Sequence, residues 1–242
     1  MNTFYNLKEA LLDLLFPSNI YCMSCQQPLL DSDNSLCPAC ASKIIWINSV
    51  SCKKCGKPLH QPSQKICHDC LEKPHSFTQG FSCTLYDDMT SKIIKDFKFH
   101  DKSYYAKPLA HMLLDKISES GIQFDAIIPV PLHKGRKKER GYNQSELLSY
   151  HLSQMIGVPM YTHVLLRKKD TSPQNRLSRL ERLSNIGEAF QLTNSSLVAG
   201  KSILLVDDVY TTGATMDACA GLLVSHHCNP VYVITCCIGT DS

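Results

Sequence analysis

One stretch near the C-terminus constrains the fold of this chain more than any other. Residues 201–215 read KSILLVDDVYTTGAT, an apolar run followed by two adjacent aspartates and a turn of small residues. Because residues 203–206 are β-branched or leucine, they predict a buried strand of a parallel sheet whose exposed end carries the two acids. Helical spacing resumes over 216–224. The order strand, loop, helix predicts a ligand site at the loop of an open α/β sheet.

The loop has the chemistry of a phosphate cradle. Its backbone amides and the start of the next helix favour an anion, and Gly213 allows close approach. Asp207 and Asp208 would repel a bare polyphosphate, so they suit sugar hydroxyls or Mg²⁺ instead. The simpler alternative is a turn in which Asp207 only caps a helix, but a cap needs one acid and no run of threonines. The pattern therefore predicts a clamp for a ribose 5-phosphate.

Eight of the 13 cysteines form two copies of one spacing. CxxC, eleven residues and CxxC occur twice, thirty residues apart, at Cys22, Cys25, Cys37, Cys40, Cys52, Cys55, Cys67 and Cys70. Two such knuckles complete a tetrahedral set of four thiolates, which suits Zn²⁺. Four protein ligands close the coordination sphere, so we predict two structural zincs, with iron in a rubredoxin-like site as the alternative. We assign one zinc to each copy, although ligands interleaved between the copies would satisfy the same spacing.

Composition and charge narrow the class of protein. No run of about 18 apolar residues occurs, so no membrane span is predicted. Residues 1–19 carry an apolar stripe broken by acids, which predicts an amphipathic helix that docks on a neighbouring surface; attachment to a membrane surface is the alternative. The formal net charge is only +3, but basic residues gather at 134–140 and 167–182. The distribution of charge, more than its sum, indicates an anionic partner.

These features divide the chain into three parts. We predict an N-terminal helix at 1–19, a double zinc ribbon at 20–75 and an α/β domain at 79–242. The ribbons have too few apolar residues for a core of their own, so metal must supply their stability. In the α/β domain, apolar runs predict further strands at 80–86, 125–131, 161–166 and 231–238. Helical spacing predicts helices at 90–99, 104–118 and 143–155, with a basic turn at 134–140.

The stretch 201–215 resembles the phosphoribosyl pyrophosphate (PRPP) signature of type I phosphoribosyltransferases, in which four apolar residues precede DD, two residues and TTGxT. The resemblance implies that Asp207 and Asp208 face the ribose 2′- and 3′-hydroxyls as catalytic residues and that Mg²⁺ accompanies PRPP. It further implies that the 5-phosphate is bound by Thr211, Thr212, Gly213, Ala214 and Thr215.

Two further segments resemble the ComF family, competence-associated proteins (ComFC/GntX-like) that are similar to phosphoribosyltransferases. PVPLHKGRKKERGYNQ matches the family pattern PVPxxxxRxxxRGxNQ. At this position phosphoribosyltransferases bind pyrophosphate, which implies a pyrophosphate loop with Val130, Pro131, Arg136 and Arg140, the two arginines being catalytic. The second segment matches at Gln174, Arg182, Asn185 and Phe190 and corresponds to a mobile catalytic loop.

Two functions fit these resemblances. In the one we favour, the chain is a ComF-type protein that handles incoming single-stranded DNA in natural transformation and retains a PRPP site. A DNA sugar lacks the 2′-hydroxyl, so we expect the strand on the flanking basic loops, at Lys137, Lys138, Lys168 and Lys169. In the alternative, the chain is a true phosphoribosyltransferase in which an acceptor displaces pyrophosphate from PRPP.

The resemblance leaves the reaction open. No hood for an acceptor base is recognisable in the sequence, so catalysis of a transfer is undecided. A DNA-uptake helicase is a candidate partner. We expect a cytoplasmic location, with the inner face of the membrane as the alternative.

Overall fold

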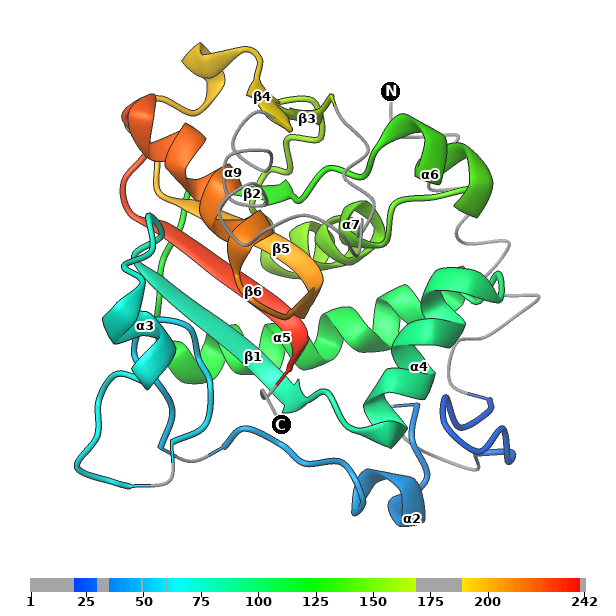
Figure 1. Cartoon of the computed structure of the whole chain (residues 1–242). Helices are drawn as coiled ribbons and strands as arrows, with labels where there is room; N and C mark the ends of the chain where they lie inside the picture. The colour runs from blue at the N-terminus through cyan, green and yellow to red at the C-terminus, as the bar shows by residue number, and fades with distance from the viewer. Residues whose placement is uncertain (1–19, 30–34, 49, 60, 169–188, 240–242) are drawn as a thin grey trace, which may run out of the picture.

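A computed structural model describes residues 20–29, 35–48, 50–59, 61–168 and 189–239 (Figure 1). The predicted helix at 1–19 lies outside the described residues. The same holds for Lys169 and for most of the basic segment, including Gln174, Arg182 and Asn185.

A parallel four-stranded sheet forms the centre of the molecule, in the order β1-β6-β5-β2. Its strands are β1 (Gln79–Leu85), β2 (Ala126–Pro129), β5 (Ile203–Tyr210) and β6 (Val231–Ile238). β2 is buried throughout, and β5 and β6 are buried along most of their length, as continuous apolar runs of a covered parallel sheet should be. The predicted α/β fold class is therefore confirmed.

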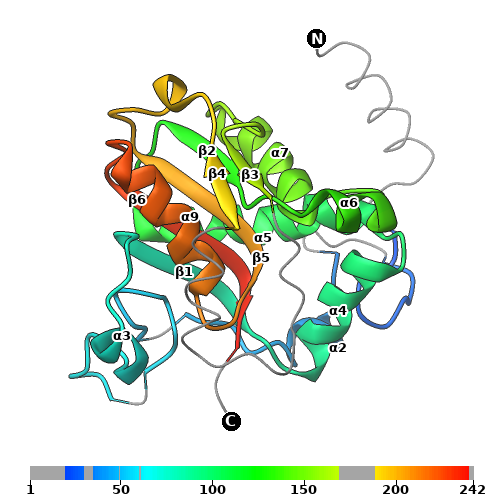
Figure 2. The same ribbon diagram turned by 45° about the horizontal axis from the view of Figure 1, so that its top comes forward.

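Helices cover both faces of this sheet (Figures 1 and 2). α5 (Ala106–Ser120) and α7 (Gln144–Ile156) pack on one face together with α4 (Asp88–Phe99). α9 (Ala214–Ser225) packs on the other face. Polar caps define where two of them begin, because Asp87 accepts a hydrogen bond from the Thr90 N–H, and the Asn143 side chain accepts one from the Ser145 N–H.

Two segments differ from the sequence-based prediction. The basic segment expected as a turn forms a helix, α6 (Lys134–Arg140), which ends at Gly141 in a left-handed conformation. The strand expected at 161–166 is confined to β3 (Leu165–Arg167), which pairs antiparallel with β4 (Phe190–Leu192). Before it, Met160 forms an isolated bridge with Ile127 of β2, so this segment shields the edge of the sheet.

The chain between the two cysteine clusters covers the opposite edge of the sheet. Ile47 N–H donates to the Cys83 carbonyl, Leu85 N–H donates to the Ile45 carbonyl, and Trp46 forms an antiparallel bridge with Thr84 of β1. The chain crosses this edge strand, so the two ribbons belong to opposite faces. The first, with α2 (Pro38–Ala41), contributes to the core under α4 and α5. The second, with α3 (His68–Glu72), contributes to the core under α9.

The remaining described elements are two 3₁₀ turns, η1 (Ser103–Tyr105) before α5 and η2 (Ser195–Leu197) before β5. No helix within the described ranges is long and apolar enough to cross a membrane.

Candidate functional site

The two predicted clamp acids lie within β5 and not at its end. The strand continues to Tyr210, and Asp207 is paired with Thr235 of β6. Asp208 is only 6% exposed. The expectation that both acids occupy an exposed strand end is therefore wrong, because β6 extends alongside β5 for its whole length and holds the acids in the ladder.

Each acid has a partner that pattern reasoning did not identify. Lys98, at the end of α4, places its ammonium 2.7 Å from Asp208 Oδ1. The Ser145 hydroxyl, in the first turn of α7, donates to Asp207 Oδ1 at 2.8 Å, and the Asp208 N–H donates to the same oxygen at 2.9 Å. Only the packing of α4 against the sheet brings Lys98 to the acids.

These contacts set the electrostatics of the pair. Burial raises the pKa of Asp207 to about 7, and the negative charge of Asp208 acts in the same direction against the favourable effects of Lys98 and Ser145. Burial lowers the pKa of Lys98, but the Asp208 carboxylate outweighs it, so the pKa of Lys98 is raised. The site therefore holds one ion pair and one carboxyl that titrates near neutrality.

The pKa of Asp207 predicts a pH-dependent stability. Between pH 3.8, the ordinary pKa of an aspartate, and about pH 7, folded Asp207 holds a proton that the unfolded chain releases. The stabilisation that this proton gives the folded state is therefore lost as pH rises through the folded pKa. One pKa unit corresponds to about 1.4 kcal/mol, so we expect the unfolding free energy to fall by more than about 1 kcal/mol from about pH 5 to about pH 8. Asp207→Asn, which resembles the protonated acid, should lose less over the same range. Urea titrations with equal pH dependence for both proteins would contradict this assignment.

The phosphate loop connects β5 to α9. Thr211 and Thr212 are exposed, whereas Ala214 and Thr215 belong to the first turn of α9 and not to the loop. Gly213 has a φ of +74°, and a Cβ at this position would lie 2.1 Å from the Tyr210 hydroxyl oxygen. The N-cap residue Gly213 has no side chain, and the Ala214 N–H makes only a long hydrogen bond of 3.5 Å to the Thr212 hydroxyl, so the first N–H groups of α9 are directed at the loop. The loop thus has the backbone geometry of an anion site.

The two predicted pyrophosphate arginines lie on α6, beside the acids. With Lys98 and Phe99 they line an open cleft of about 410 Å³. The Arg140 guanidinium lies 4.8 Å from the centre of the Phe99 ring and donates to Gln144 Oε1 at 2.8 Å. Since Lys98 both lines this cleft and pairs with Asp208, the structure brings the arginines and the acidic pair to one side of the molecule.

The segment before α6 is held close to the acids by β5 and α7. Val130 N–H donates to the Val206 carbonyl at 2.9 Å, and the Asn143 side chain donates to the Val130 carbonyl at 3.1 Å. Val130 is buried and Pro131 is partly exposed. This segment therefore follows β2 at the carboxyl ends of the strands, where the clamp also lies and where an open α/β sheet places its ligands.

The lysines predicted to contact DNA differ in their surroundings. Lys137 Nζ lies 2.6 Å from Glu146 Oε2, so its charge is partly compensated. Lys138 is exposed on α6. Lys168 is exposed directly after β3, and its N–H donates to the Ala189 carbonyl.

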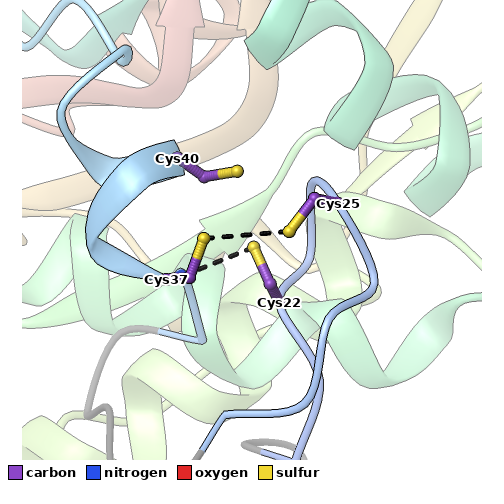
Figure 3. A group of neighbouring side chains, drawn as sticks. All are labelled: Cys22, Cys25, Cys37 and Cys40. Atoms are coloured by element: carbon purple, nitrogen blue, oxygen red, sulfur yellow. Dashed lines mark hydrogen bonds between the residues drawn. The ribbon is translucent and has the colours of Figure 1, made fainter.

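The eight cysteines form two separate sites of four. Within each copy of the spacing, the four sulfurs all lie within 4.8 Å of one another, so the ligand sets follow the sequence and are not interleaved. Figure 3 shows the first set, with the four side chains directed toward one another. The sulfurs of Cys25 and Cys37 are 3.7 Å apart, as are those of Cys55 and Cys67. Zn–S bonds of about 2.3 Å in a tetrahedron place the sulfurs about 3.8 Å apart. Both sets therefore fit a tetrahedral metal.

Backbone N–H groups donate to sulfurs in both sets of cysteines, as expected for metal ligands. The Cys37 N–H donates to the sulfur of Cys22 at 3.4 Å, and the Cys67 N–H donates to the sulfur of Cys52 at 3.2 Å. Such bonds stabilise thiolate ligands and orient them toward the metal.

Comparison with known proteins identifies two family models and several relatives. Residues 11–71 match the family model of the double zinc ribbon domain, and residues 138–240 match that of the phosphoribosyl transferase domain. The chain is 33% identical to Competence protein F of Haemophilus influenzae over 85% of this chain and 91% of that protein. It is 34% identical to DNA utilization protein YhgH of Salmonella typhimurium over 89% and 96%. It is 30% identical to Competence protein ComFC of Bacillus subtilis over 87% and 80%.

Proposed function

Because this chain belongs to the ComF family of competence proteins, we propose that it handles incoming single-stranded DNA in natural transformation and binds PRPP with Mg²⁺ at the β5–α9 site. The observation that carries the proposal is a group of residues at the carboxyl ends of the strands. There Asp207 and Asp208 precede a phosphate loop, and basic helix α6 lies alongside. The double zinc ribbon would take no part in the chemistry, since its two halves pack into the cores on the two faces of the sheet.

At the clamp, each group has a separate task. The N–H groups at the start of α9 would hold the 5-phosphate, and the two acids would accept hydrogen bonds from the ribose hydroxyls. Mg²⁺ would neutralise part of the charge on the pyrophosphate. Arg136 and Arg140 would hold the pyrophosphate through the cleft that they line with Lys98.

The DNA strand would follow the basic surface beside this clamp. Lys137 and Lys138 on α6 and Lys168 after β3 would contact phosphates without regard to sequence, and Lys169 lies outside the described residues. The names of the relatives, which refer to competence and DNA utilization, favour this role. A helicase of the uptake machinery is a candidate partner, and the cytoplasm, including the inner face of the membrane, is the compartment in which such a strand arrives.

A true phosphoribosyltransferase is the second candidate function. The match to the phosphoribosyl transferase domain favours it, as does the cleft of about 410 Å³, which has room for an acceptor beside the arginines. Release of pyrophosphate from PRPP on addition of an acceptor would establish it.

Titration of the purified protein tests the proposal. PRPP with Mg²⁺ and a fluorescent single-stranded oligonucleotide are added separately and then in competition. We expect both to bind, with PRPP displacing little DNA because the strand lies beside the clamp. Absence of PRPP binding would remove the clamp from the proposal, and full displacement of DNA would place the strand in the clamp itself.

The four lysines predicted to contact DNA are called the track lysines, and the surface that carries them the track. Replacing them should weaken DNA binding at every sequence tested. In the variant with Lys137, Lys138, Lys168 and Lys169 changed to alanine, each lost phosphate contact should reduce the slope of log affinity against log salt by about 0.7. Lys137 should contribute least, because Glu146 already compensates it. Fluorescence anisotropy at several salt concentrations measures both quantities.

A matched variant separates this track from the zinc ribbons. Lys53→Ala with Lys65→Ala removes two exposed basic residues of the second ribbon, and PRPP binding serves as a control for both proteins. Wild-type DNA affinity and salt slope in the track variant would rule out the α6 surface as the track.

A further inference from the structure

The segment that joins the second zinc ribbon to β1 lies against the phosphate loop. His75 is the central residue: its ring stacks on Phe77, with centroids 4.8 Å apart, and its side chain is only 8% exposed. Its Nε2 lies 3.3 Å from the Tyr210 hydroxyl oxygen, and its Nδ1 lies 3.6 Å from Asp217 Oδ1. One imidazole thus bridges the last residue of β5 and the first turn of α9, the two elements that hold the loop.

Asp217 orients this imidazole. A proton on Nδ1 is favoured beside the carboxylate, which leaves Nε2 to accept a hydrogen bond from the Tyr210 hydroxyl. The same Oδ1 atom accepts a hydrogen bond of 2.5 Å from the Ser76 N–H. Asp217 is therefore turned toward the ribbon segment, although its place in the first turn of α9 would otherwise put a negative charge near the proposed phosphate.

Tyr210 contacts both His75 and the phosphate loop. Its hydroxyl lies so close to Gly213 that a Cβ there would be 2.1 Å away, and its ring meets Phe77 edge to face, with centroids 6.5 Å apart. A shift of the tyrosine would therefore release Gly213, whose left-handed conformation begins α9. Gly213, the N-cap residue of α9, has no side chain, and the loop's own contact with the helix is a long hydrogen bond of 3.5 Å from the Ala214 N–H to the Thr212 hydroxyl. The Tyr210 contact therefore adds support that the loop does not supply itself.

The first ribbon is attached elsewhere. Its Met23 carbonyl accepts a hydrogen bond from the Tyr105 hydroxyl at 2.8 Å, and its Ser24 carbonyl accepts one from Lys92 Nζ at 2.9 Å. Its buried residues belong to the core under α4 and α5, on the opposite face of the sheet from α9. Of the two ribbons, only the second therefore contacts the elements that hold the phosphate loop, within the described residues.

We propose that His75, acting through Tyr210 and Asp217, positions the phosphate loop, so that the second zinc ribbon and not the first supports binding of a sugar 5-phosphate. The proposal rests on the proposed function for its ligand, because the loop is taken as the 5-phosphate site. His75 is a positioning residue and does not contact the ligand.

Affinity for PRPP with Mg²⁺, measured by calorimetry, tests the contact. We expect His75→Ala to weaken binding about tenfold, a coupling typical of residues in contact, and His75→Gln, which retains a polar group able to reach Tyr210, to restore part of it. In a Tyr210→Phe background, His75→Ala should have little further effect. His68→Ala is the matched control, since this histidine of the same ribbon has a side chain that is 79% exposed. Additive losses in the double variant would overturn the proposal.

Amide hydrogen exchange of the ligand-free protein provides a second readout. His75→Ala and Cys67→Ser should increase exchange at residues 211–216, whereas Cys37→Ser, in the first ribbon, should not. If the wild-type protein binds no PRPP, the proposed function fails while exchange still decides the positioning role. Unchanged exchange at 211–216 in both His75→Ala and Cys67→Ser, or equal increases from the two ribbons, would overturn the proposal.

Discussion

Asp208→Ala is expected to abolish PRPP binding and also to destabilise the protein in the absence of ligand. The ligand effect follows from the loss of a proposed acceptor for the ribose hydroxyls. The second effect follows from Lys98, whose ammonium lies 2.7 Å from Asp208 Oδ1 and whose side chain is only 21% exposed. Breaking a fully buried pair costs about 3–5 kcal/mol; because Lys98 retains some contact with water, we expect about 2–3 kcal/mol.

A compensating variant separates the two effects. Asp208→Ala combined with Lys98→Met removes the unpaired ammonium and should recover most of the lost unfolding free energy, but no PRPP binding. Urea unfolding measures the first quantity and calorimetry the second. Wild-type stability in Asp208→Ala would show that Lys98 is solvated without its partner, and wild-type PRPP affinity would eliminate the acid from the clamp.

Loss of either metal site is expected to destabilise the protein strongly. The protein should contain two zincs per chain, and Cys22→Ser or Cys52→Ser should each remove one. Structural zinc contributes about 10–16 kcal/mol of apparent binding free energy in small zinc-finger peptides, so a ribbon that loses its metal should unfold locally. Cys22 and Cys52 are almost fully buried, in the cores on opposite faces of the sheet, so each loss should also lower the melting temperature of the whole chain.

Elemental analysis and thermal unfolding check this expectation. Cys228→Ala is the matched control, because this cysteine is buried but belongs to neither set of four, and it should retain two zincs. Iron in the purified protein, or a single zinc, would contradict the assignment. Simultaneous loss of both metals in Cys22→Ser would contradict the independence of the two sites.

Local patterns predicted much of the fold. β6 was expected at 231–238 and is observed at those residues, because a continuous apolar run next to a turn has few alternatives in an α/β chain. α4 and α7 begin within two residues of their expected starts, since Asp87 and Asn143 are polar caps that the sequence displays. The helix at 134–140 was missed because it exposes most of its residues and so has no apolar stripe.

The chemical groups of the candidate sites could be predicted from local sequence: two sets of four thiolates at a repeated spacing, an acidic pair before a phosphate loop and a group of arginines. Each of these depends on residues close together in the chain, whose geometry is set by local backbone constraints. Tertiary structure alone decided that Lys98 neutralises Asp208 and that the two ribbons lie on opposite faces of the sheet. It also placed His75 between the second ribbon and the phosphate loop. These contacts join segments up to 142 residues apart and form only when helices and ribbons pack on the sheet, so no local pattern encodes them.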